Sequence, residues 1–268
     1  MEKTKLYSLL KRIVTALVLI PVTIWCLYAG YPFAQVFALV FGAMFSWEWS
    51  YMVPNKRPAF YAMAYMLAVS VAIMLASVLV FGVVLLGTVI LVWKKSEGEQ
   101  YRRLLVLGVP YVSIGIGSVM WVYEFVGYLA TFWFFLAVWC VDIGGYVVGC
   151  TLKGPKLASK ISPNKTWSGL LGGVAFSVVA SLVFCYFAGT TSHYVFYGVL
   201  AAIIAVIAQI GDLVESSIKR HLGIKDSSQL IPGHGGVFDR IDGLVFVAPF
   251  VLGMLCFFSR GFGYGMVD

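Results

Sequence analysis

Long apolar stretches separated by short polar segments recur along the whole chain of 268 residues. A membrane-spanning helix needs about 20 predominantly apolar residues, so each stretch has the length of one span. The pattern predicts nine spans, at residues 13–29, 32–51, 59–76, 77–93, 104–121, 128–149, 169–188, 194–212 and 243–259. The expected fold class is therefore all-α, a polytopic transmembrane helical bundle.

The division between the third and fourth spans rests on length. Residues 59–93 carry no charge, and a single helix over all of them would be longer than an apolar core about 30 Å thick. Two spans joined by a tight turn near Ser77 fit better.

The basic residues test this count. If the N-terminus is cytoplasmic and the spans alternate, the inside loops hold all but one of the 19 lysines and arginines, and only Arg260 falls outside. Such asymmetry is what the positive-inside rule predicts, and merging the third and fourth spans would destroy it. We therefore expect an integral protein of the cell membrane with a cytoplasmic N-terminus and an outside C-terminus.

Composition supports lipid as the solvent. The chain is 61% hydrophobic and 12% charged, whereas a soluble domain carries about 25% charged residues. The net charge of +7 lies in the short clusters between apolar stretches, which points to membrane topology and away from nucleic acid. The five cysteines lie in or beside apolar stretches and form no CxxC pair, so neither a zinc site nor a disulfide framework is indicated.

We expect residues 1–268 to form a single membrane-embedded domain, with N-terminal spans in residues 1–125 and catalytic spans in residues 126–268. Two of the expected inside loops, residues 150–168 and 213–242, are longer and more polar than the others. Any chemistry should lie there, on the cytoplasmic face.

Carboxylates and basic residues are concentrated around the second of these loops. Asp239 and Asp242 are three residues apart, so a helix beginning here would place them on one face. Asp212, at the end of the preceding span, would complete a cup of three carboxylates. Hard oxygen ligands favour magnesium, which commonly bridges substrate phosphates. The glycine-rich run 233–236 permits close backbone approach to a phosphate, and a helix N-terminus after it favours an anion.

Plainer roles remain open for single residues. Asp239 could be only a helix cap, Lys219 and Arg220 could be only topology charges, and His234 could be simply solvated. Asp142 falls within an expected span, where a carboxylate is costly and is a functional candidate by default. Lys165 precedes a helix start, where it could meet a phosphate or a lipid headgroup.

The run from Ser217 to Asp242 resembles the signature of the phosphatidate cytidylyltransferase family, also called CDP-diacylglycerol synthases. That signature has a serine, then Lys-Arg, Lys-Asp, His-Gly-Gly, Asp-Arg and Asp, which stand here as Ser217, Lys219-Arg220, Lys225-Asp226, His234-Gly235-Gly236, Asp239-Arg240 and Asp242.

Other segments carry the same resemblance more weakly. The segment Ser162–Trp167 resembles a Ser-Pro-Lys-Lys-Thr segment of the family, although Ser168 stands where members commonly have Glu. Asp142 ahead of Gly145-Tyr146, and the pair Trp47-Glu48, are also similar to family features.

The resemblance implies transfer of the CMP moiety of CTP to phosphatidic acid, which gives CDP-diacylglycerol and pyrophosphate. It implies one or two magnesium ions on Asp212, Asp239 and Asp242, which with Lys165, Lys219, Arg220 and Arg240 form the expected catalytic set. The expected nucleotide-binding residues are Lys225, Asp226, His234, Gly235 and Gly236, and Asp142 and Ser217 are further candidates. Expected partners are CTP, phosphatidic acid, the lipid bilayer and, by resemblance alone, a second copy in a homodimer.

Two other classes remain as alternatives. A polyprenol kinase or another CTP-using lipid enzyme would share much of the loop chemistry. A transporter is compatible with nine spans and an intramembrane Asp142, but neither a repeat nor a broken helix is clear in the sequence.

Overall fold

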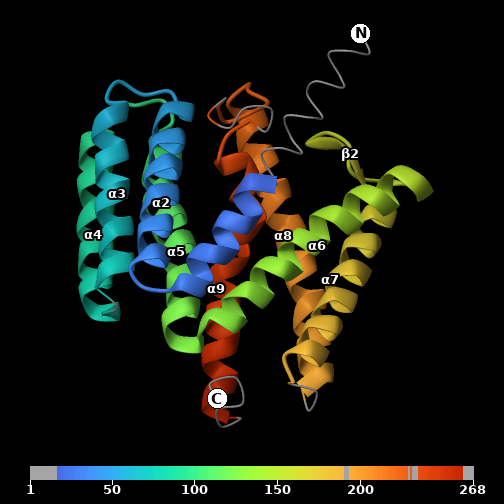
Figure 1. The fold of residues 1–268 in the computed structure, drawn as a ribbon. Helices are drawn as coiled ribbons and strands as arrows, with labels where there is room; N and C mark the ends of the chain where they lie inside the picture. Colours follow the sequence, from blue (N-terminus) through green and yellow to red (C-terminus); the bar gives the residue numbers. More distant parts are fainter. Residues whose placement is uncertain (1–16, 76, 190–192, 229, 231–234, 262–268) are drawn as a thin grey trace. The chain divides into compact units, whose positions relative to one another are not determined.

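The computed structural model describes residues 17–75, 77–189, 193–228, 230 and 235–261. In this part of the chain it has nine helices and one small sheet (Figure 1). The helices are Leu17–Ala29, α2 (Phe33–Met52), α3 (Pro58–Met74), α4 (Val78–Lys95), α5 (Arg102–Val126), α6 (Tyr128–Leu152), α7 (Trp167–Phe187), α8 (Tyr194–His221) and α9 (Phe238–Gly261). The two strands are β1 (Lys156–Ala158) and β2 (Ser162–Thr166).

Each expected span overlaps one of these helices, so the predicted helical, membrane-like fold is confirmed. Residues 13–16 of the first expected span lie outside the described residues. Within the described residues, six helices are long and apolar enough to cross a membrane: α4, α5, α6, α7, α8 and α9. The crossing of the bilayer by all nine, and the side on which the N-terminus lies, stay predictions.

The turn expected near Ser77 is present. Helix α3 ends at Met74, and α4 begins at Val78 with Ser77 as its N-cap residue. Two helices therefore divide the uncharged run of residues 59–93, as its length requires.

The first expected loop, residues 150–168, contains a hairpin that the all-α prediction missed. Strands β1 and β2 pair antiparallel, with Lys156 opposite Thr166 and Ala158 opposite Ser162. Strand β1 has only three residues and β2 is polar, so neither carries the alternation of apolar and polar residues by which a strand is found in a sequence.

The second expected loop, residues 213–242, begins later than expected, because α8 continues to His221. Gly211, Glu215 and Lys219 are all buried and recur every four residues, which is the spacing of one helix face. The polar composition after Asp212 therefore marks the end of an apolar span but not the end of the helix.

The chain divides into two compact units. The first contains residues 1–121 and 224–241, and the second contains residues 122–223 and 242–268. In the first unit, α2 packs on α3 and α3 on α4, and Trp49 and Tyr65 are almost fully buried. Their side chains donate hydrogen bonds to carbonyls of α5, from Trp49 Nε1 to Leu104 at 3.1 Å and from Tyr65 Oη to Leu105 at 2.7 Å.

In the second unit, α6 and α7 approach closely through glycines. A Cβ added at Gly144 would lie 2.6 Å from the carbonyl oxygen of Gly172, and one at Gly173 would lie 2.9 Å from that of Val141. Small residues let two membrane helices come together in this way. Helix α7 also packs against α8.

Candidate active site

Three carboxylates meet in the second unit. Asp212 and Glu215 come from α8 and Asp242 from α9, and one oxygen of each lies within 4.8 Å of the others. Asp212 and Glu215 are three residues apart, so the continuation of α8 places them on one face. Glu215 is almost fully buried, at 1% exposure.

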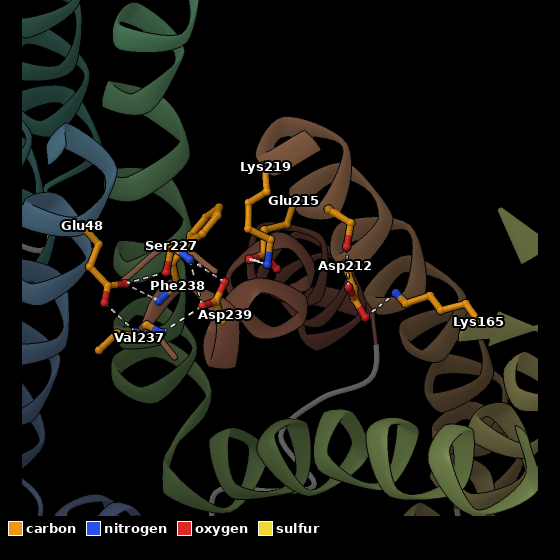
Figure 2. A network of polar contacts seen from close by, with 11 residues as sticks. Glu48, Lys165, Asp212, Glu215, Lys219, Ser227, Val237, Phe238 and Asp239 are labelled. Atoms are coloured by element: carbon orange, nitrogen blue, oxygen red, sulfur yellow. Dashed lines mark hydrogen bonds and ion pairs between the residues drawn. The ribbon is translucent and has the colours of Figure 1, made fainter. Parts of the chain in front are cut away.

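Two lysines neutralise part of this charge, as Figure 2 shows. The ammonium of Lys165 forms an ion pair with Asp212, and that of Lys219 lies 2.7 Å from the carboxylate of Glu215. Ser216 also donates a hydrogen bond of 3.4 Å to Asp212. Three carboxylates whose oxygens converge in this way offer the hard oxygen ligands that a divalent cation prefers.

A polar cleft of about 920 Å³ opens beside Asp212 in the same unit. Lys165, Lys153, Lys156 and Asp142 are the other charged residues that line it. The remaining lining residues come from α6, α7, α8 and the segment between α6 and α7: Val141, Gly145, Tyr146, Gly149, Cys150, Gly154, Ser162, Asn164, Thr166, Gly169, Ala208 and Gln209. The cleft has the volume of a small-molecule site, and it brings together three predicted residues, Asp142, Lys165 and Asp212.

The hairpin positions Lys165. Strand β2 ends at Thr166, which is the N-cap of α7 and accepts a hydrogen bond of 3.1 Å from the amide of Gly169. The side chain of Ser168 donates to the carbonyl of Lys153 and lies 3.0 Å from the Thr166 hydroxyl. Ser168, which stands where family members commonly have Glu, therefore links the two ends of the segment that carries Lys165.

Asp239 belongs to the first unit and is not one of the three grouped carboxylates. It lies in the first turn of α9, as predicted, and accepts backbone hydrogen bonds from Gly236 at 2.9 Å and Ser227 at 3.1 Å. In the described structure its carboxylate thus has a role close to that of a helix cap.

Glu48 of α2 binds the same segment of the first unit, as Figure 2 shows. Its carboxylate accepts hydrogen bonds from the amides of Val237 at 2.8 Å and Phe238 at 2.7 Å. It also accepts from the hydroxyls of Ser228 at 2.5 Å and Ser227 at 3.4 Å. The sequence predicts a phosphate at the N-terminus of α9. In the structure the carboxylate of Glu48 binds the amides there.

The glycines beside it make room for these two carboxylates. A Cβ at Gly235 would lie 2.7 Å from Asp239 Oδ2, and Gly235 has a positive φ of 84°. A Cβ at Gly236 would collide first with the Ser227 hydroxyl, and it would lie 2.7 Å from Glu48 Oε1. The two glycines therefore allow the backbone to approach anions closely, as the sequence predicts. In the described structure these anions are the carboxylates of Asp239 and Glu48.

The other predicted residues lie in two places. Ser217, Lys219 and Arg220 are in the last turns of α8, in the second unit. Lys225, Asp226 and Arg240 are in the first unit, where all three are exposed. His234 lies outside the described residues.

Sequence reasoning missed two acidic residues. Glu215 could have been found from its spacing with Asp212 and Lys219, had α8 been extended past Asp212. Glu48 was noted only beside Trp47, since its partners are about 180 residues away along the chain.

Comparison with known proteins shows the family of this chain. The chain matches the family described as "Cytidylyltransferase family" over residues 10–258. It is 35% identical to the phosphatidate cytidylyltransferase of Brucella suis, over 90% of this chain and 91% of that protein. Proteins with the same name from Bacillus subtilis (32% identical, over 79% of this chain and 76% of that protein) and Haemophilus influenzae (31%, over 90% and 96%) also match. The family match covers nearly the whole chain, and these relatives extend it over most of their own length, so the chain belongs to the cytidylyltransferase family.

Proposed function

We propose that this protein is a membrane-embedded phosphatidate cytidylyltransferase, which converts CTP and phosphatidic acid into CDP-diacylglycerol and pyrophosphate. The observation that carries the proposal is the lysine-flanked group of Asp212, Glu215 and Asp242 in a chain whose relatives bear this name over most of their length. An acidic group with adjacent cations is suited to a metal-bound polyphosphate.

In the proposed reaction, an oxygen of the lipid phosphate attacks the α-phosphorus of CTP. A new P–O bond forms, and the bond from the α-phosphorus to the oxygen bridging to the β-phosphate breaks. The electron pair of that bond leaves with pyrophosphate. Because the attacking phosphate is already an anion near neutral pH, the protein's task is mainly to position and neutralise.

Asp212, Glu215 and Asp242 are the residues that would hold a divalent cation, which we take to be magnesium. When bound, such an ion neutralises phosphate oxygens and stabilises the leaving group. Asp239 remains a predicted metal ligand from its place in the signature.

Lys165 is the cation best placed to bind phosphate in the cleft, since it lines the cleft and pairs with Asp212. Lys153 and Lys156 line the same cleft and add positive charge. Lys219 neutralises Glu215, and Arg220 and Arg240 are proposed to bind phosphates. The nucleotide-binding roles of Lys225, Asp226, His234, Gly235 and Gly236 follow from the signature.

The proposed location follows from the two substrates. Phosphatidic acid stays in the bilayer and CTP is dissolved in the cytoplasm, so the site should lie at the cytoplasmic surface of the cell membrane. The concentration of basic residues in the expected inside loops supports this orientation. A homodimer rests on the resemblance alone.

The test uses purified protein in detergent micelles with phosphatidic acid and two preparations of CTP, one labelled on the α-phosphorus and one on the γ-phosphorus. We expect only the α label to enter lipid, and only when phosphatidic acid and magnesium are both present. Entry of the γ label would identify a kinase. Entry of neither label, with protein that is folded, would overturn the proposal.

A further inference from the structure

We propose that Glu48 is a positioning residue, which holds residues 227–228 and 235–238, on either side of the middle of the segment between α8 and α9, in the arrangement that binds CTP. This inference rests on the proposed function, because the segment carries the residues expected to bind the nucleotide. All the contacts that support it lie within the first unit.

The first observation is the burial of a carboxylate with a complete set of donors. Glu48 is 1% exposed on α2, and both of its oxygens accept hydrogen bonds. An ionised carboxylate in such a place is costly unless it is well bonded. The two backbone amides at the start of α9 supply the positive end of a helix, which stabilises a negative charge.

The second observation is where the donors come from. Ser227 and Ser228 lie at the beginning of the segment, and Val237 and Phe238 lie at its end. One side chain of α2 therefore joins the two ends of the segment. Gly235 and Gly236, which directly precede Val237, are positioned by that link.

The third observation is a second carboxylate, Asp239, which also bonds to both sides of the segment. Asp239 also joins the beginning, at the amide of Ser227, to the end, at the amide of Gly236. Asp239 belongs to the signature, and its orientation is set by the same turn that Glu48 holds.

The fourth observation is the packing on either side of Glu48 along α2. Phe45 stacks on Phe238 with ring centroids 5.1 Å apart, and Trp49 meets Phe238 edge-on at 5.4 Å. Residues 45, 48 and 49 share one helix face, so α2 presents a charged group between two aromatic anchors. The anchors would keep the start of α9 on α2 when the charge is removed, which makes the role of the charge separable from folding.

The experiment compares Glu48→Gln with the matched control Glu97→Gln. Glutamine keeps the shape but turns an NH₂ group toward the amide of Val237 or Phe238. Glu97 is an exposed glutamate in the turn after α4, so its variant should behave as the wild type. Two readouts are needed, steady-state kinetics in micelles and hydrogen exchange of the purified protein.

We expect Glu48→Gln to raise the KM for CTP and to lower kcat/KM for CTP by about 10–100-fold, since misplacing a group by about 1 Å can cost about 100-fold in rate. The KM for phosphatidic acid should not change. Amide exchange over residues 224–241 should become faster while exchange in α3 stays as it is. Glu48→Asp, which keeps the charge on a shorter side chain, should fall between the wild type and Glu48→Gln.

If Glu48→Gln does not fold, Ser228→Ala removes the 2.5 Å hydrogen bond to Glu48, together with the 3.0 Å bond that the hydroxyl accepts from the amide of Leu230. This variant should shift both readouts in the same direction, by less. Unchanged exchange and an unchanged KM for CTP would overturn the inference. A fall in kcat alone that follows the loss of folded protein would show a structural role and would also overturn it. Amide hydrogen exchange can be measured without catalytic activity, so it tests the role of Glu48 by itself. If the proposed function is wrong, the wild-type protein will also fail to transfer CMP to lipid.

Discussion

Lys165, next to last in the polar strand β2, forms an ion pair with Asp212 of α8. The pair lies on the wall of the polar cleft and beside two further carboxylates, Glu215 and Asp242. It links the two segments that sequence reasoning had singled out separately.

Replacing Lys165 with methionine should lower activity by at least about 100-fold, as for loss of one group that stabilises charge in the transition state. The KM for CTP should rise because a phosphate partner is lost. The magnesium concentration for half-maximal activity should fall, because Asp212 loses its competing cation. Lys160→Met, at an exposed turn residue between β1 and β2, is the control. A higher magnesium requirement in Lys165→Met would contradict this account.

Glu215→Gln should weaken divalent-metal binding and reduce activity by at least about 100-fold. Mutation of a residue that only hydrogen-bonds to a metal ligand costs about 10–100-fold, and loss of a ligand itself should cost more. The variant removes one of three grouped carboxylates and the partner of Lys219. The measurement is the rise in melting temperature on adding magnesium, which should shrink. A rise equal to that of the wild type would remove Glu215 from the metal site.

Asp239→Asn should abolish the transfer of α-labelled CMP to lipid while leaving the protein inserted in the membrane. It should also destabilise the turn before α9, since an amide replaces a carboxylate that accepts from Gly236 and Ser227. The loss of a charged acceptor is worth about 1–3 kcal/mol. Activity and thermal stability measured on the same sample separate the two effects. Full activity would reject Asp239 as a metal ligand.

Gly173→Ala should lower the thermal stability of the protein, because the added methyl group would meet the carbonyl oxygen of Val141 at 2.9 Å. Overpacking of this kind costs about 1–3 kcal/mol. Gly253→Ala is the control, since a Cβ there meets nothing within 4 Å. Equal melting temperatures for the two variants would contradict the close packing of α6 on α7.

The predicted topology can be tested by thiol labelling in intact cells, in a version without the five native cysteines. Glu97→Cys should be shielded from a membrane-impermeant reagent, because residues 94–103 are expected inside. Tyr128→Cys, at the start of α6, should be labelled from outside. The reverse pattern would invert the orientation, and labelling of both would reject the alternation of spans.

The sequence by itself determined the helices and the family. Apolar length set the nine helical segments, including the break at Ser77, because a chain in lipid must satisfy its backbone within each helix. The spacing from Ser217 to Asp242 was specific enough to indicate the enzyme class, and the comparisons support it.

Only the tertiary structure decided which carboxylates lie together. The grouping of Glu215 with Asp212 and Asp242 depends on α8 continuing past its apolar part. A hydropathy pattern does not show where a helix with a polar end stops. The binding of Glu48 to residues about 190 positions away depends on how α2 meets the start of α9. Such long-range pairs are set by packing and charge in three dimensions, and no local pattern along the chain records them.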